Sequence, residues 1–167
     1  ACPAEKLEYA GAQQKLNQLL AKYGKYIFDN CISKNDVETI SLIIDSGIDI
    51  RAKADSDGWT FLHSAAFNNS TEIAQLLIEH GADINSKTDD GWTPLHHATN
   101  YDTTKTAQLL IESGADIHVK DNNEWTPLHI AAMNFSKKTV QKLIEYGADI
   151  HSVDKHGQTP LHHATRK

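Results

Sequence analysis

The sequence repeats itself every 33 residues, and this period limits the possible folds more than any other feature does. Tryptophan recurs with this step at Trp59, Trp92 and Trp125, and Gly-Ala-Asp-Ile recurs at 81–84, 114–117 and 147–150. The step also relates three further sets: Thr60, Thr93, Thr126 and Thr159; Leu62, Leu95, Leu128 and Leu161; His63, His96, His129 and His162. Because unrelated positions share one period, the sequence predicts an array of similar units.

Each unit predicts a pair of helices. Threonine followed by proline starts the first helix, since threonine caps a helix well and proline at the first helical position costs no hydrogen bond. Apolar residues at helical spacing, Ile73, Leu76 and Leu77 in one unit, predict a second helix. The glycine of Gly-Ala-Asp-Ile then supplies a left-handed cap. One such pair cannot bury its own apolar face, so the pairs are predicted to stack as a solenoid.

The period and the motifs Asp-Gly-Trp-Thr-Pro-Leu-His-His-Ala (90–98) and Glu-Trp-Thr-Pro-Leu-His-Ile-Ala-Ala (124–132) resemble ankyrin repeats. This resemblance implies an all-α-dominated solenoid of helix-turn-helix units joined by β-hairpin-like loops, with an N-terminal capping helix. It divides the chain into an N-terminal segment with the capping helix (1–24), a degenerate repeat (25–54), complete repeats (55–87, 88–120 and 121–153) and a C-terminal half repeat (154–167).

Three residues depart from the family pattern. Phe61 replaces the usual proline, Glu124 replaces a turn glycine, and Phe135 stands in the turn between two helices, where the family usually has glycine. None of them shifts the repeat. We expect Glu124 and Phe135 to distort the turns of the third complete unit locally.

The composition excludes two classes of partner. The chain has 16 Lys and Arg against 22 Asp and Glu, a net charge of −6, and no basic run that could neutralise phosphates, so we expect no nucleic-acid binding. Its apolar stretches are far shorter than the roughly 20 residues that a bilayer helix needs, so we expect no membrane insertion.

The 10 histidines do not form a recognisable metal or catalytic motif. In ankyrin repeats the histidine of Thr-Pro-Leu-His is structural and hydrogen-bonds within its turn and to the neighbouring unit. His118 and His151 stand where the family usually has asparagine, which implies a turn role for them as well. Zinc-type Cys/His spacings, nucleophile elbows and phosphate loops are absent from the sequence. We predict no metal, no cofactor and no catalytic residue.

The family's geometry places the residue before Thr-Pro-Leu-His on the concave surface. Trp59, Trp92 and Trp125 are then expected to form a row that Gln158 continues, and tryptophan is a strong interface anchor. The alternative is that these rings pack on the neighbouring hairpin. The ends of the first helices add further candidate partner-binding residues: Phe67, Asn68, Asn100, Tyr101, Met133 and Asn134.

The predicted hairpin tips carry acidic residues at one end of the row, namely Asp57, Asp89 and Asp90. A basic patch on a partner protein would complement them. The alternative is that these carboxylates are simply solvated turn residues.

The two cysteines bear on the cellular compartment. Cys31 aligns with a small core position, which predicts a buried thiol, and Cys2 lies in a start, Ala-Cys-Pro-Ala, that lacks Met. Such a start is typical of an exported chain after removal of a signal peptide, in which a Cys2–Cys31 disulfide could form. The alternative is a cytoplasmic protein with two reduced thiols.

The resemblance implies a non-catalytic module that binds a protein partner through the concave face, as an adaptor or scaffold. We expect it to be monomeric. The last unit stops after its first helix, as in a module cut from a longer chain. The alternative is a dedicated inhibitor or immunity-type protein that occludes the active site of a partner enzyme.

Overall fold

The computed structural model describes residues 14, 26, 28–100 and 104–165. Within these residues the secondary structure is helical and no strand occurs. Residues 28–33 are helical, and the labelled helices that follow are α2 (Val37–Asp45), α3 (Phe61–Phe67), α4 (Thr71–Glu79), α5 (Pro94–Asn100), α6 (Thr104–Glu112), α7 (Pro127–Met133), α8 (Lys137–Glu145) and α9 (Pro160–Ala164). The predicted capping helix falls, except for Gln14, outside the described residues.

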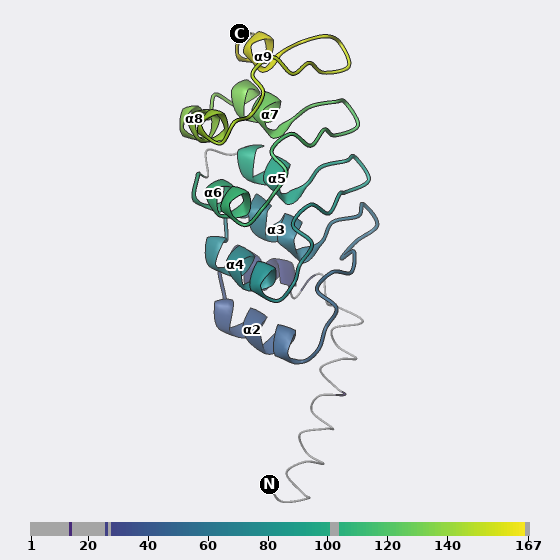
Figure 1. Cartoon of the computed structure of the whole chain (residues 1–167). Helices are drawn as coiled ribbons and strands as arrows, with labels where there is room; N and C mark the ends of the chain where they lie inside the picture. The colour runs from purple at the N-terminus through teal and green to yellow at the C-terminus, as the bar shows by residue number, and fades with distance from the viewer. Residues whose placement is uncertain (1–13, 15–25, 27, 101–103, 166–167) are drawn as a thin grey trace, which may run out of the picture.

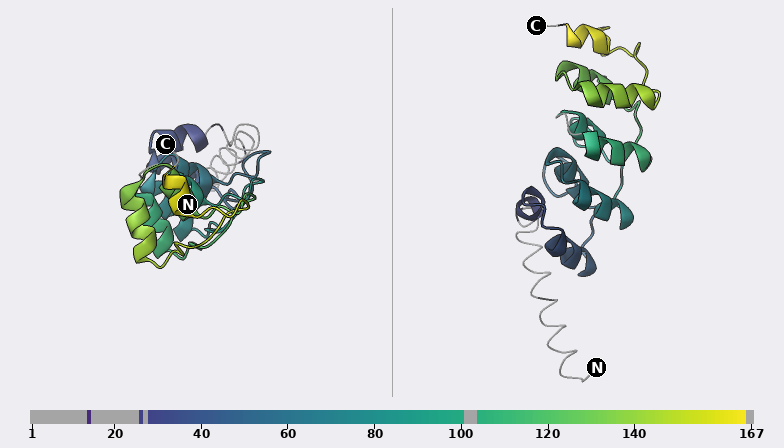
Figure 2. Two further views of the ribbon diagram at one scale, coloured as in Figure 1. Left: turned by 90° about the horizontal axis from the view of Figure 1, so that it is seen from above. Right: turned by 90° about the vertical axis from the view of Figure 1, so that its left-hand side faces the viewer.

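The helices form two parallel rows, and the loops project to the side (Figure 1). One row contains α3, α5, α7 and α9, in which each helix packs on the next, and the other contains α2, α4, α6 and α8. The second view of Figure 2 shows the helix pairs stacked one above another along the molecule. The predicted all-α solenoid is therefore confirmed.

Threonine and histidine together start the first helix of each pair. In α3 the side chain of Thr60 lies against the backbone N–H of the third helical residue, while the ring of His63 accepts a hydrogen bond from the backbone N–H of Thr60. The same box starts α7 and α9. Two N–H groups that a helix would leave without partners are thus satisfied at each start.

Phe61, which replaces proline at the start of α3, has a packing role. Its ring stacks on that of Phe28 with the two centroids 3.6 Å apart and the planes inclined by 15°. Both rings are buried in the same apolar cluster, which continues through Leu62, Ile73 and Leu95. This departure from the repeat pattern therefore joins the helix at residues 28–33 to α3.

The loops are hairpin-like fingers that an aspartate or threonine closes. Asp121 Oδ1 accepts hydrogen bonds from the backbone N–H groups of Asn123 and Trp125, both at 2.8 Å. Asp55 and Asp154 do the same in their own fingers, and Thr88 Oγ1 accepts from the N–H of Trp92. Successive fingertips are joined by backbone hydrogen bonds, such as Asp89 N–H to Asp57 C=O at 2.9 Å. The fingers therefore form a continuous ladder.

The predicted distortion of the turns at Glu124 and Phe135 is wrong. Both residues adopt the left-handed conformation, with φ of 60° and 56°. The N–H of Glu124 donates to Asp121 C=O at 2.9 Å, which is the same turn bond that Gly91 makes at 2.9 Å one unit earlier. The turns keep the geometry of the other units. Glu124 and Phe135 therefore adopt a left-handed backbone conformation that glycine adopts more easily.

Candidate functional site

The histidines of the repeated motif are buried structural groups. The Nδ1 atom of His63 accepts the N–H of Thr60 at 3.0 Å, so Nε2 carries the proton and donates to the backbone oxygen of Trp92 at 3.1 Å. His96 and His129 make the same pair of bonds. Burial lowers the pKa of His63 and of His96 to about 4, so both rings are neutral at pH 7. Each histidine therefore ties its own helix start to the next finger.

Each tryptophan is half-buried against a histidine ring. The centroid of Trp59 lies 4.3 Å from that of His97, and the centroid of Trp92 lies 4.9 Å from the same ring. Trp125 packs on His163 with the centroids 4.5 Å apart. The packing alternative is thus present in the structure, and part of each indole remains exposed; the row as a partner-binding surface stays a prediction.

His97 separates two of the tryptophans as an uncharged spacer. Only 6% of its surface is exposed, and its Nε2 atom has no hydrogen-bond partner within the described part of the chain. Burial, together with the nearby His63 and His96, lowers the pKa of His97 to about 3. The ring is therefore uncharged at pH 7 where it contacts Trp59 and Trp92.

The finger aspartates also orient rings, which the sequence analysis missed. Asp121 Oδ2 accepts the indole N–H of Trp92 at 3.0 Å, and Asp154 Oδ2 accepts the ring N–H of His163 at 2.9 Å. Burial opposes ionisation of Asp154, but hydrogen bonds from the Gln158 backbone and from His163 hold its pKa well below the usual range. A signal was available, since an aspartate or threonine stands four residues before each tryptophan and before Gln158.

The ends of the first helices place further predicted residues beside the tryptophans. Phe67 is 40% exposed and meets Trp59 edge to face with the centroids 5.6 Å apart, and Met133, at the corresponding position of α7, is 36% exposed. Asn134 donates its amide N–H to Asn100 Oδ1 at 2.9 Å, so these two asparagines lie together. Tyr101 lies outside the described residues. We call the surface formed by Trp59, Trp92, Trp125, Phe67, Asn68, Asn100, Met133 and Asn134 the Trp face.

A hollow of about 330 Å³ opens at the N-terminal end of the Trp face. It brings together four residues that the sequence analysis singled out: Asp57, Trp59, Phe67 and Asn68. Three more residues line it that sequence reasoning missed: Asp29, Asp55 and Ser64. We call this space the acidic hollow.

The other acidic fingertip residues lie away from this hollow. Asp89 is exposed and pairs with Lys53, with Nζ and Oδ1 3.2 Å apart. Asp90 is exposed as well, and its backbone oxygen accepts the N–H of Asn122. Of the three predicted fingertip carboxylates, Asp57 lines the hollow and Asp89 already has a cation beside it, while the basic partner stays a prediction.

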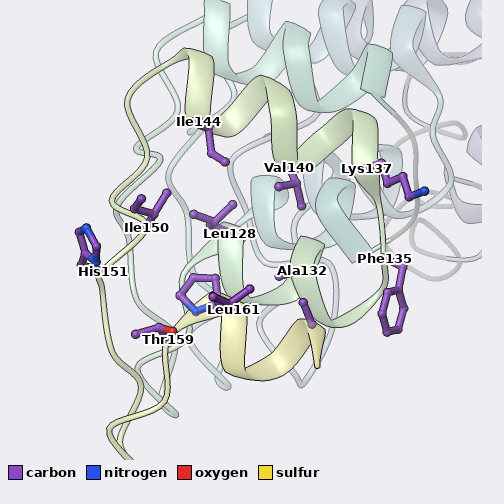
Figure 3. A pocket seen from close by; sticks show the side chains of 12 residues that line it. Leu128, Ala132, Phe135, Lys137, Val140, Ile144, Ile150, His151, Thr159 and Leu161 are labelled. Carbon is purple, nitrogen blue, oxygen red and sulfur yellow. The ribbon is translucent and has the colours of Figure 1, made fainter. Parts of the chain in front are cut away.

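A second, apolar hollow of about 450 Å³ lies between α8 and α9 (Figure 3). Ile144 and Val140 reach it from α8, Leu161 from α9, and Ile150 from the loop that joins these two helices. In the preceding units the corresponding space is covered by a second helix, as α8 covers Leu128. After α9 the described chain contributes no such helix, which is why Leu161 is 70% exposed.

The remaining predictions concern a disulfide, a metal site and membrane insertion. Cys31 is buried and forms no disulfide with any residue that the structure describes, while Cys2 lies outside the described residues, so the bridge stays a prediction. Nowhere in residues 28–100 and 104–165 do three or more His, Cys, Asp or Glu side chains gather in a way that could hold a metal ion. None of the helices in these ranges is long and apolar enough to cross a membrane.

Comparison with known proteins decides the family. A family model of ankyrin repeats, described as three copies of the repeat, matches residues 28–121 and 103–167. The chain belongs to the ankyrin-repeat family. Ankyrin repeats indicate a protein–protein interaction module, and such modules are in general non-catalytic.

Two curated proteins illustrate the similarity. A stretch of 56 residues, 34% of this chain, is 34% identical to the potassium channel AKT3 of Oryza sativa subsp. japonica and covers 6% of it. A stretch of 52 residues, 31% of this chain, is 38% identical to the 2-5A-dependent ribonuclease of Mus musculus and covers 7% of it. The ankyrin-repeat chain therefore spans only a small part of the length of the curated relatives that it matches.

Proposed function

We propose that this ankyrin-repeat chain is a non-catalytic adaptor or scaffold module that binds a partner protein through the Trp face, the concave face of the array. The observation that carries the proposal is the row of half-buried tryptophans, each braced by a histidine or an aspartate, beside the exposed side chains of Phe67 and Met133. The domain boundaries expected from the sequence, 25–54 through 154–167, stand as part of this proposal.

The physical argument is that of a preorganised protein interface. Aromatic side chains and methionine are enriched in the cores of protein interfaces, where they bury a large area. Because His97 and Asp121 already fix the indole rings, a partner loses little side-chain entropy when it packs on them. The asparagines beside them supply donors and acceptors that can align the partner.

The test is a capture experiment with the full 167-residue chain as bait and an extract of its native cells as the source of partners. We expect Phe67→Ser and Met133→Ser each to reduce capture of a specific protein at least tenfold. Leu42→Ser in α2 is the matched control, because Leu42 is an equally apolar and more exposed side chain in the other row of helices. The proposal fails if Leu42→Ser abolishes capture and the two Trp-face variants do not.

The curated relatives favour the adaptor over the inhibitor, since in each of them the matched segment is a small part of a much longer protein. The same experiment separates the two functions. An inhibitor predicts that the captured protein is an enzyme and that one molar equivalent of this chain abolishes its activity. An adaptor predicts that the activity of the captured protein persists in the complex.

A further inference from the structure

We propose that His97 is the positioning residue for Trp59 and Trp92, and that its protonation in acid displaces both indoles and weakens partner binding at this end of the Trp face. The inference rests on the proposed function and gives it a means of regulation. Trp125, at the other end of the row, is positioned by a different pair of residues and keeps its place at the same pH.

The imidazole of His97 contacts the aromatic rings of two successive units. Its centroid lies 4.3 Å from that of Trp59, which stands before α3, and 4.9 Å from that of Trp92, which stands before α5. The rings of His63 and Phe67 on α3 meet it nearly at right angles, at 5.7 and 6.1 Å. Displacing this one ring therefore removes a support from both indoles.

Protonation has opposite consequences for the two buried histidines that contact tryptophans. His163 Nε2 lies 2.9 Å from Asp154 Oδ2, so a carboxylate stands where a protonated ring needs one. His97 Nε2 is buried and has no hydrogen-bond partner within the described residues. A buried imidazolium is stabilised by an adjacent carboxylate and is costly without one. Acid therefore acts on the support of Trp59 and Trp92 and spares that of Trp125.

The ionisable groups on the helices around His97 supply no compensating negative charge. Burial is the largest cause of its lowered pKa, and the nearby rings of His63 on α3 and His96 on its own helix lower the pKa further. Helices α6 and α7 also pack on α5. Their ionisable side chains are exposed or bonded to other groups: Lys105 and Glu112 of α6 are exposed, and His129 of α7 bonds to Thr126 and Gln158.

The carboxylates of the adjoining fingers are bonded to other groups or exposed at the fingertips. Asp55 Oδ1 accepts two backbone N–H groups of its own turn, and Asp121 accepts two such groups and the indole N–H of Trp92. The exposed fingertip carboxylates are Asp57, Asp89 and Asp90. A proton on His97 therefore has no carboxylate partner in the part of the chain that the structure describes.

The size of the effect follows from the two environments of the ring. In the folded chain the pKa of His97 is about 3, against 6.5 for a histidine in water. A displaced ring regains the ordinary pKa, so lowering the pH from 7 to 5 favours the displaced ring about 25-fold. Because a partner that packs on Trp59 and Trp92 requires this ring in place, its affinity falls in the same direction.

The test is a pH titration of the uniformly ¹⁵N-labelled full chain from pH 7 to pH 5, followed by NMR. The three indole N–H signals are the reporters, and we expect the Trp59 and Trp92 signals to shift together while the Trp125 signal stays unchanged. His97→Ile is the matched variant, since isoleucine stands at the corresponding position, Ile130, and it should abolish the shifts. Asp154→Asn removes the carboxylate beside His163 and should make the Trp125 signal sensitive to acid as well.

Three results would overturn the inference: a common shift of all three indoles in the unmodified chain, shifts of Trp59 and Trp92 that persist in His97→Ile, and a Trp125 signal that does not respond in Asp154→Asn. Capture of the partner extends the test. The unmodified chain should retain at least about threefold less partner at pH 5 than at pH 7, and His97→Ile should retain equal amounts. Equal losses in the two chains would also refute the inference. Failure of the proposed function is distinguishable, because Phe67→Ser and Met133→Ser would then leave capture at pH 7 intact.

Discussion

At the scale of single residues, this protein builds its surface on buried neutral histidines. His63 and His96 donate from Nε2 to the backbone of the next finger, and His97 separates two indoles without a hydrogen bond at that atom. A protonated ring in any of these places would bury a charge without a compensating partner, which is costly. The geometry of the Trp face therefore depends on the protonation state of residues beneath it.

This dependence predicts that stability falls as the pH falls below 6.5. In the folded chain the pKa is about 4 for His63 and His96 and about 3 for His97, against 6.5 when unfolded. Between pH 6.5 and 4 the unfolded state thus binds protons that the folded state does not. Each histidine then lowers the free energy of unfolding by up to about 1.4 kcal/mol per pH unit. Urea unfolding at pH 7, 6 and 5 measures the slope.

The control variant for this prediction is His97→Ile. Isoleucine stands at the corresponding position, Ile130, in the next unit, so the repeat accommodates it. In the variant, the chain should take up about one proton fewer on unfolding at acidic pH, so the free energy of unfolding should depend less steeply on pH. The variant should remain folded. A free energy of unfolding that is constant between pH 7 and 5 would contradict the role given to these histidines.

At the scale of the elements, one residue type at one repeat position has different surroundings along the array. Leu95 in α5 is completely buried, because α3, α6 and α7 all pack on α5. Leu161 in α9 holds the same repeat position and is 70% exposed at the apolar hollow. The stability of such an array comes from contacts between neighbouring units, so its last described helix is the least supported.

The comparison predicts very different costs for the same substitution. Leu95→Ala should lower the free energy of unfolding by about 2–5 kcal/mol, as is usual for a cavity in a packed core. Leu161→Ala should change it by less than about 0.5 kcal/mol, since little contact is lost. Chemical denaturation of both variants measures the difference. Equal losses would mean that α9 is covered in solution.

The helices could be predicted from the sequence, and much of the site could not. The threonine before α3, α5, α7 and α9, followed by proline in all of them but α3, and the glycine after α4, α6 and α8 are local signals that recur every 33 residues, and the structure follows them. The acidic hollow depends on the small size of Ser64 relative to His163, and on contacts between Trp59 and a ring 38 residues later. Such contacts depend on how individual side chains of neighbouring units pack on one another. The repeat pattern predicts that the units stack but does not specify this packing.

The turns also show where prediction from local sequence fails. The left-handed turns at Glu124 and Phe135 were expected to be distorted because neither residue favours that conformation. They keep the turn bonds of the other units, since hydrogen bonds to neighbouring residues fix the backbone. The repeat as a whole therefore overrides the local preference of these two residues.

At the scale of the whole molecule, the stack presents a long surface and has no single central core. The fingertips are joined by backbone hydrogen bonds from Asp57 through Asn123 to Lys155, so the fingers form one continuous edge (Figure 1). The net charge of −6 and the carboxylates of the acidic hollow give this edge a negative end. A partner with basic side chains at the matching end fits this distribution of charge.

The most direct test of the central claim is hydrogen–deuterium exchange of the chain with and without a captured partner. The account predicts protection on the Trp face, in the fingers around residues 57–59, 89–92 and 122–125 and at the ends of α3 and α7. It predicts unchanged exchange in α4, α6 and α8. Protection confined to α4, α6 and α8 would contradict the claim that this ankyrin-repeat chain binds its partner through the Trp face.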